Sequence, residues 1–133
     1  MENKMKKGYK ELIEEANSLI ETISIETAMS IFDNDDYSFI DLRDFRELKR
    51  SGKIPGSFSC PRGMLEFWID PESPYHKDIF SQEKHFVFYC ASAWRSALAT
   101  KTALEMGLPR VSHIEGGFTA WIREDGKIEQ LTE

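Results

Sequence analysis

The sequence has few of the residues that build metal sites and disulfide frameworks. It contains only two cysteines, Cys60 and Cys90, which form no C-x-x-C pair, and three histidines without zinc-binding spacing. We therefore expect no metal site. Two isolated cysteines also fit a reducing compartment better than an oxidising one.

Long apolar runs and clusters of basic residues are also missing. No stretch approaches the roughly eighteen apolar residues of a membrane span. The basic residues near the start are not followed by an apolar core, so they do not predict a signal peptide. The formal net charge is −6, which argues against binding a phosphate backbone. We expect a cytoplasmic protein that binds neither membranes nor nucleic acid.

Length and composition favour one globular domain. A chain of 133 residues with 41% hydrophobic residues can bury enough surface for its own core. Apolar residues at helical spacing predict an amphipathic helix over residues 8–21. We expect residues 1–21 to form an N-terminal helix packed on a single domain, 22–133. A helix that binds a partner is the alternative.

Strand-like and helix-like segments alternate along the chain. Strands are predicted over residues 22–25, 37–42, 85–89 and 110–114, and helices over 8–21, 26–32, 45–50, 63–69, 97–106 and 118–122. This alternation predicts an α/β fold with a central parallel β-sheet and helices on both faces. In such sheets ligands bind beyond the carboxyl ends of the strands, which is where Cys90 lies.

Cys90 indicates chemistry more directly than any other residue. It follows the strand over 85–89 and opens a short loop, residues 90–96, that leads into a helix. Unpaired N–H groups and about half a positive charge at a helix start favour a thiolate and hold an anion beside it. The small residues Ala91, Ser92 and Ala93 suit a loop that turns its amides onto one point. The alternative is a buried, inert cysteine.

Other residues have a functional and a structural interpretation. Arg95 either binds an anion or is an exposed cation in the first helical turn. Arg62 either holds an anion at the pocket rim or stabilises the helix that follows it. Cys60 either forms a disulfide with Cys90 or is a buried structural residue. Asp41, with Arg43, is expected to form a stabilising polar network.

Three stretches resemble motifs of the rhodanese-like sulfurtransferases, and the likeness runs from about Thr22 to Lys127. The stretches are Asp41 to Glu47 with Gly52 to Ser57, then Cys90 to Ala97, and finally Glu115 to Trp121. The first has Lys53 where the family usually has His. The second, which resembles the active-site loop, has Ala93 where many members have Gly.

The resemblance implies a rhodanese-like fold and a single-domain sulfurtransferase. The implied substrate-binding groups are the amides of Ala91, Ser92, Ala93, Trp94 and Arg95 and the side chain of Arg95. Arg62 at the pocket rim is a further candidate for binding the anion. They would hold a small anionic sulfur donor such as thiosulfate while Cys90 becomes a persulfide. A thiol or cyanide acceptor, or a protein sulfur acceptor, would then remove the sulfur. The implied reaction needs neither a metal nor an organic cofactor.

Two further functions stay open at this point. A rhodanese-like module can carry persulfide or bind a partner with little turnover. Phosphatases and arsenate reductases of the same fold class have one more residue between Cys and Arg than the four between Cys90 and Arg95. The shorter loop leaves room for a sulfur atom and is tight for a tetrahedral phosphate, so sulfur transfer is favoured.

Overall fold

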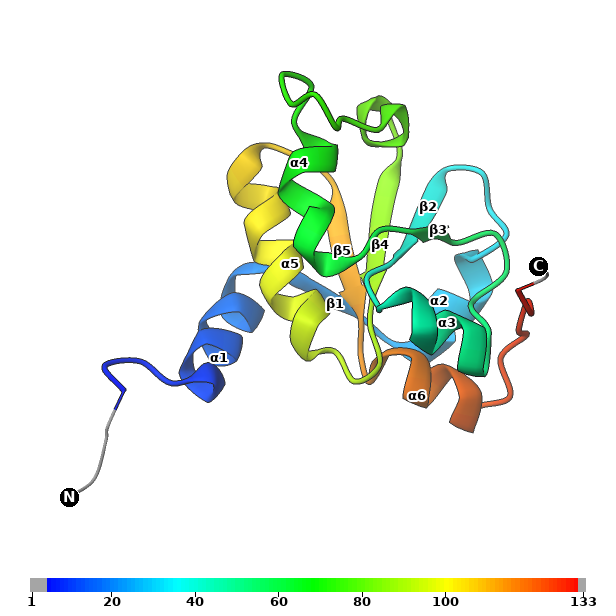
Figure 1. Ribbon diagram of the computed structural model, residues 1–133. Helices are drawn as coiled ribbons and strands as arrows, with labels where there is room; N and C mark the ends of the chain where they lie inside the picture. Colours follow the sequence, from blue (N-terminus) through cyan, green and yellow to red (C-terminus); the bar gives the residue numbers. More distant parts are fainter. Residues whose placement is uncertain (1–4, 132–133) are drawn as a thin grey trace.

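Five parallel strands form the centre of the protein (Figure 1). The computed structural model describes residues 5–131. The strands lie in the order β1-β5-β4-β2-β3, and they are β1 (Glu21–Ile23), β2 (Tyr37–Asp41), β3 (Phe58–Ser59), β4 (His85–Tyr89) and β5 (Val111–Ile114). The sheet confirms the predicted α/β fold with a central parallel sheet.

Helices cover both faces of this sheet. They are α1 (Tyr9–Leu19), α2 (Ile25–Ile31), α3 (Phe45–Ser51), α4 (Leu65–Ile69), α5 (Trp94–Met106) and α6 (Gly117–Arg123), with two 3₁₀ turns, η1 (Arg62–Met64) and η2 (Asp78–Ser81). Within residues 5–131, none of these helices is long and apolar enough to cross a bilayer.

Strand β4 shows how its alternating side chains divide the core. Phe86 and Phe88 are buried in one apolar cluster, which includes residues of α4 and α5. Val87 and Tyr89 are buried in a second cluster, with residues of α2 and α6. Because successive side chains of a strand point to opposite faces, the two clusters lie on opposite faces of the sheet. Cys90 belongs to the cluster on the α5 side.

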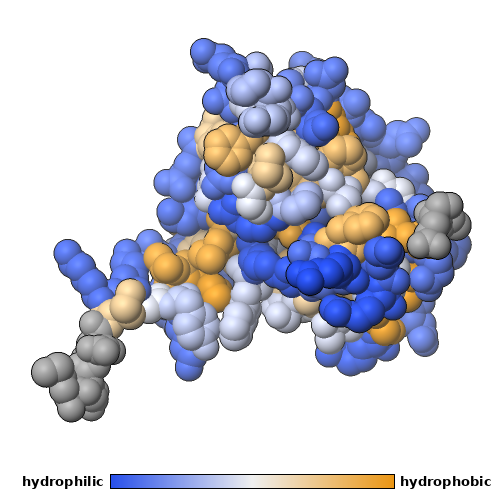
Figure 2. Space-filling view, in the orientation of Figure 1, coloured by the Kyte–Doolittle hydropathy of each residue, from blue (hydrophilic) through white to orange (hydrophobic). Residues whose placement is uncertain are grey.

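Helix α1 packs against α5 and extends that layer (Figure 1). Its buried residue is Ala16, while Leu12 and Leu19 are exposed. Figure 2 shows an apolar area where α1 lies, together with further apolar areas elsewhere on the same face. Helix α1 therefore lies beside the helix that begins at the Cys90 loop.

The main differences between the observed and the predicted elements concern β3, η2, α4 and α5. Strand β3 and the turn η2 were not predicted, because each is only a few residues long and has no periodic pattern. The helix predicted over residues 63–69 is divided into η1 and α4. Helix α5 begins at Trp94, three residues earlier than predicted, because the backbone turns sharply at Ala93.

Candidate active site

Cys90 directly follows β4, and its side chain faces the start of α5. Its Sγ accepts a hydrogen bond from the Ser96 N–H, with an N···S distance of 3.3 Å. Ser96 is the third residue of α5, so this N–H is one of those that a helix start leaves without an intrahelical acceptor. Both residues are buried, and Cys90 is 1% exposed. The sulfur therefore lies under the positive end of a helix and is nearly closed off from solvent.

Helix α6 sets the direction of the first peptide groups in the loop. The N–H of Phe118 donates to the Cys90 carbonyl at 2.8 Å, and the N–H of Thr119 donates to the Ala91 carbonyl at 3.0 Å. No peptide bond of the described residues is cis. In a trans peptide the N–H points opposite to the C=O. The amides of Ala91 and Ser92 therefore point away from α6.

This arrangement depends on a glycine at the start of α6. Gly117 has a φ of +60°, and a Cβ at this position would lie 2.5 Å from the Cys90 oxygen and 2.7 Å from the Ala91 oxygen. A side chain would therefore push the loop away from the α6 amides. The second glycine of the Glu115 to Trp121 motif is required by this close approach.

Ala93 is the residue at which the loop turns into the helix. It has φ 72° and ψ 4°, the left-handed region that favours glycine. Trp94 can then begin α5 immediately. Among residues 5–131, the amides of residues 91–95 have no protein acceptor. The loop thus has a run of N–H donors without a protein partner next to Cys90, and their turn toward the sulfur stays a prediction.

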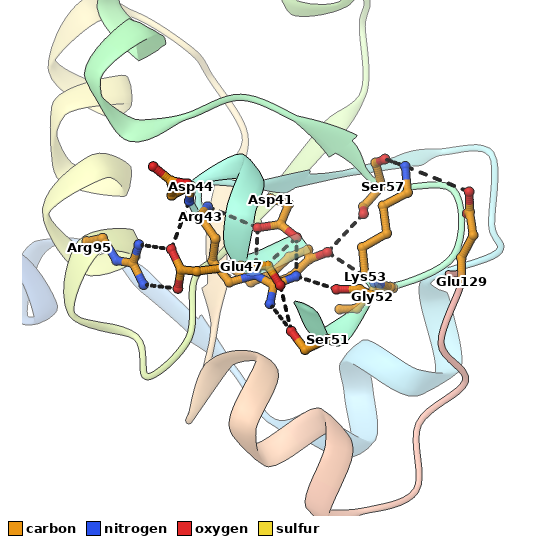
Figure 3. A network of polar contacts seen from close by, with 12 residues as sticks. Asp41, Arg43, Asp44, Glu47, Ser51, Gly52, Lys53, Ser57, Arg95 and Glu129 are labelled. Carbon is orange, nitrogen blue, oxygen red and sulfur yellow. Dashed lines mark hydrogen bonds and ion pairs between the residues drawn. The ribbon is translucent and has the colours of Figure 1, made fainter. Parts of the chain in front are cut away.

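Arg95 is held by a carboxylate from another helix (Figure 3). Its Nη1 and Nη2 donate to the two oxygens of Glu47 at 2.9 and 3.1 Å. The hydrogen bond to Glu47 raises the pKa of Arg95, and proximity to the Cys90 sulfur also raises it. The ion pair lowers the pKa of Glu47, which stays ionised. The guanidinium is therefore a fixed cation next to Cys90.

Glu47 was not singled out in the sequence analysis, although it lies in the motif that begins at Asp41. It is the third residue of α3, where its carboxylate accepts from the Asp44 N–H in a capping box. One side chain thus caps α3 and clamps Arg95. An acidic residue three positions after an Asp N-cap is the sequence signal for the cap, but the contact with Arg95 spans 48 positions.

Asp41 and Arg43 form the predicted polar network beneath this pair (Figure 3). Arg43 Nη2 donates to Asp41 Oδ2 at 2.8 Å and to the Gly52 carbonyl at 2.7 Å, and both charged side chains are buried. The guanidinium also lies 4.1 Å from the centre of the Phe118 ring. The network therefore ties the β2–α3 turn to α6, which holds the Cys90 loop.

Arg62 has an ion-pair partner in its own segment. Its Nη1 donates to Glu66 at 2.9 Å, four positions further along the chain. This contact matches the stabilising alternative for Arg62. In the described part of the chain, Arg62 makes no hydrogen bond or ion pair with the residues of the Cys90 loop.

Cys60 does not lie within disulfide reach of Cys90. The register pairs Asp41 with Ser59 on β3 and with Tyr89 on β4, so one strand separates the two cysteines. At the usual strand spacing their Cα atoms are about 10 Å apart, beyond the range of a disulfide. Burial raises the pKa of the Cys60 thiol to about 12. The geometry therefore favours a structural cysteine.

The loop has an exposed aromatic side chain where it enters α5. Trp94 is 55% exposed and stacks at 5.0 Å on Tyr9 of α1, with a tilt of 44° between the rings. Ser92 is exposed as well. Helix α1 thus contributes one aromatic ring beside the loop.

Other features of the described chain lie away from this site. A hollow of about 590 Å³ is lined by residues near the amino ends of β2 and β4, among them Tyr37 and Lys84. Parallel sheets bind ligands at the opposite edge, beyond the carboxyl ends of the strands, so we place the candidate site at Cys90. Residues 5–131 contain no group of three or more His, Cys, Asp or Glu that could hold a metal ion.

Known protein families identify the domain to which this site belongs. The model of the rhodanese-like domain matches residues 24–124. The chain belongs to the rhodanese-like family. Two relatives support this: a thiosulfate sulfurtransferase/rhodanese-like domain-containing protein 3 from Mus musculus and a sulfurtransferase from Allochromatium vinosum.

Both curated relatives are 30% identical to the chain. The alignment with the mouse protein spans 98 residues, which are 70% of this chain and 62% of the mouse protein. The alignment with the bacterial protein spans 91 residues, which are 68% of this chain and 77% of the bacterial protein. The chain thus spans less than two thirds of the mouse protein.

A solved structure from Rhodopseudomonas palustris has the same rhodanese-like architecture. It is 56% identical, covers 97% of this chain and 99% of its own, and superposes with a TM-score of 0.93. That protein is of unknown function and is described as a possible tyrosine phosphatase.

Proposed function

We propose that this rhodanese-like chain is a sulfurtransferase that moves sulfane sulfur through a persulfide on Cys90. The observation that carries the proposal is the Cys90 sulfur at the end of β4, 3.3 Å from the Ser96 amide at the start of α5. Helix-start N–H groups favour a negatively charged sulfur, which is the nucleophilic form. The sulfurtransferase relative from Allochromatium vinosum supports the reaction class.

In the first half-reaction, the Cys90 thiolate attacks the outer sulfur of an anionic donor such as thiosulfate. A bond forms between Sγ and that sulfur, the S–S bond of the donor breaks, and sulfite leaves with the bonding electron pair. The free amides of residues 91–95 are the groups that we expect to hold the sulfonate end. Arg95 adds the N–H groups that do not donate to Glu47.

In the second half-reaction, a thiol or cyanide attacks the outer sulfur of the persulfide. The bond between Sγ and the outer sulfur breaks, and its electron pair returns to Cys90 as a thiolate. Cyanide leaves as thiocyanate, and a thiol leaves as a persulfide. Donor and acceptor react in turn at one atom, so the kinetics are ping-pong.

Burial of Cys90 restricts which donors reach it. With 1% of the residue exposed, we expect only slim reagents to reach the sulfur. Thiosulfate, polysulfides and organic persulfides all present a single terminal sulfur atom, which is slim enough for a narrow approach between loop side chains. The small side chains of Ala91 and Ala93 limit the obstruction in the loop.

Steady-state turnover of thiosulfate and cyanide tests the proposal. Cys90→Ser removes the nucleophile, and we expect turnover to fall at least about 1,000-fold. Cys60→Ser is the matched control, since it removes the other buried thiol and leaves the loop intact. Turnover that survives in Cys90→Ser, or disappears equally in Cys60→Ser, would contradict the assignment.

A persulfide carrier with little turnover is the second candidate. The exposed Leu12 and Leu19 on α1, which lies beside the candidate site, favour this function because they offer an apolar surface to a partner. A carrier would take up one sulfur atom on Cys90 from a donor but release it to cyanide only slowly. Single-turnover loading measured beside steady-state turnover separates the two functions.

Phosphate-ester hydrolysis is the third candidate, because the Rhodopseudomonas palustris protein is described as a possible tyrosine phosphatase. The loop has only four residues between Cys90 and Arg95, which is tight for a tetrahedral phosphate. Hydrolysis of a chromogenic aryl phosphate distinguishes a phosphatase from a sulfurtransferase. We expect no release of the phenol, and release that depends on Cys90 would replace the sulfurtransferase proposal.

A further inference from the structure

Ser96 is held from three sides at the start of α5. Its N–H donates to Cys90 Sγ, its carbonyl oxygen accepts from Thr100 Oγ1 at 2.7 Å, and its hydroxyl lies 2.8 Å from His113 Nδ1. Ser96 is fully buried and His113 is 2% exposed. The contact with His113 ties the first turn of α5 to β5, the strand beside the one that leads into Cys90.

His113 is itself fixed by a second hydroxyl. Its Nε2 lies 3.0 Å from Thr22 Oγ1, and Thr22 is also its register partner on β1. A neutral imidazole donates from one ring nitrogen and accepts at the other, so a hydroxyl at each nitrogen satisfies the ring. Burial lowers the pKa of His113 to about 4, which keeps the ring neutral at pH 7.

The polar chain from Thr22 through His113 to Ser96 ends one hydrogen bond from the Cys90 sulfur. The amide that contacts the sulfur and the hydroxyl that contacts the imidazole belong to the same residue. A tilt of the first turn of α5 away from the sheet therefore stretches both contacts together. Resistance to that tilt comes from a buried hydrogen bond, which is unfavourable to break without a replacement partner.

We propose that His113 is a positioning residue for Cys90, holding the Ser96 hydroxyl so that the Ser96 amide stays directed at the sulfur. This inference rests on the proposed reactivity of Cys90. The imidazole acts through Ser96 and exchanges no proton or bond with the sulfur donor.

Two substitutions of His113 separate the Ser96 contact from the Thr22 contact. Asn places a polar atom near the position of His Nδ1, so His113→Asn keeps a partner for the Ser96 hydroxyl. Gln places one near Nε2, so His113→Gln keeps a partner only for Thr22. Val111→Ala is the control for destabilisation, because Val111 is a buried residue of the same strand and its truncation leaves a cavity.

The readout is the rate at which iodoacetamide modifies Cys90 in the folded protein, measured beside the free energy of unfolding in urea. We expect His113→Gln to slow modification about tenfold, and His113→Asn and Val111→Ala to stay within about twofold of the wild-type rate. If the alkylation rates of the three variants decrease in the same order as their free energies of unfolding, His113 has a structural role only and the inference is overturned. Equal rates in His113→Asn and His113→Gln would also overturn it.

Alkylation separates this inference from the proposed function. A wild-type protein whose Cys90 is modified in the predicted variant order, but which turns over no sulfur donor, would reject the sulfurtransferase and keep the positioning role. Turnover that requires Cys90, together with alkylation rates that do not change when His113 is substituted, would keep the sulfurtransferase and reject the positioning role. A Cys90 inert to iodoacetamide in the folded wild type would reject the inference.

Discussion

Cys60 and Cys90 occupy similar places in the fold and have different surroundings. Each directly follows a parallel strand, each is free, and their exposed fractions are 0% and 1%. Among the described residues, the Cys60 sulfur makes one long hydrogen bond, 3.9 Å to the Pro61 carbonyl. The Cys90 sulfur accepts an amide hydrogen bond at a helix start and has Arg95 beside it.

From this comparison we expect that burial alone does not decide whether a thiol reacts. Burial is the largest cause of the raised pKa of Cys60, about 12, because it desolvates the charged form, and the nearby Arg62 lowers this pKa only in part. At Cys90 the start of α5 supplies an N–H donor. The position of a helix start relative to the strand end is therefore the difference that we expect to separate an inert cysteine from a reactive one.

The largest expected effect is a difference in alkylation between the two cysteines. In the folded protein we expect iodoacetamide to modify Cys90 at least about 1,000 times faster than Cys60, because a thiol with a pKa of about 12 is almost entirely protonated at neutral pH. Peptide masses over time measure both rates in one sample. In urea the two rates should converge, and similar rates in the folded protein would break the comparison.

The next largest effect concerns Gly117, which lies beneath the Cys90 loop. Gly117→Ala places a Cβ against two loop carbonyls in a left-handed conformation, and we expect it to lower the free energy of unfolding by about 3 kcal/mol and to slow Cys90 alkylation about 100-fold.

Gly63→Ala is the control for this change. Among the described residues no atom lies within 4 Å of a Cβ at Gly63, so both quantities should change little. Urea denaturation and alkylation kinetics measure them. An unchanged alkylation rate in Gly117→Ala would show that α6 does not set the loop geometry.

A third effect is a pH dependence of stability that belongs to the Cys90 side of the sheet. The pKa of His113 is lowered from 6.5 to about 4, so between these values the unfolded chain binds a proton that the folded protein does not. The neutral His113 contributes fully to the free energy of unfolding above about pH 6.5. As the pH falls to about 4, this contribution is lost and the free energy of unfolding decreases by about 3 kcal/mol.

Urea denaturation of the wild type and His113→Asn across this range measures that loss. Acidic side chains titrate in both proteins, so the difference between the two curves isolates the imidazole. A constant difference from pH 7 to pH 4 would contradict a buried neutral His113.

The smallest effect is expected at Ala93, where the loop backbone is strained. Ala93→Gly relieves a φ of 72° but adds freedom to the unfolded chain, so we expect a net stabilisation of about 0.5 kcal/mol. If the strain also misdirects the amides, alkylation of Cys90 becomes faster in this variant. Thermal unfolding measures the stability change, and a loss of stability would show that the native turn does not disfavour alanine.

Much of the fold could be predicted because its main elements have local patterns. The apolar, β-prone runs of β2 and β4 and the helical spacing in α1 and α5 are visible in short windows of the sequence. Strand β3 has only two residues and depends on pairing with β2, which no local pattern records. The early start of α5 also escaped prediction, because it requires a left-handed alanine.

The candidate site divides in the same way. Cys90 and Arg95 are neighbours in one loop, so their proximity follows from the sequence. Glu47 and His113 reach the loop from α3 and β5, 48 positions from Arg95 and 17 positions from Ser96. Their roles depend on the strand order and register of the sheet, which bring distant segments together. Arg62 pairs with Glu66 in its own segment, and its place at the rim stays a prediction.

The central claim is that one of two buried cysteines accepts a sulfur atom. Intact mass after incubation with thiosulfate, followed by peptide mapping, tests it most directly. The account predicts one added sulfur atom on the peptide with Cys90, removable by a reductant, and none on the peptide with Cys60. An unchanged mass, or sulfur on Cys60, would contradict it.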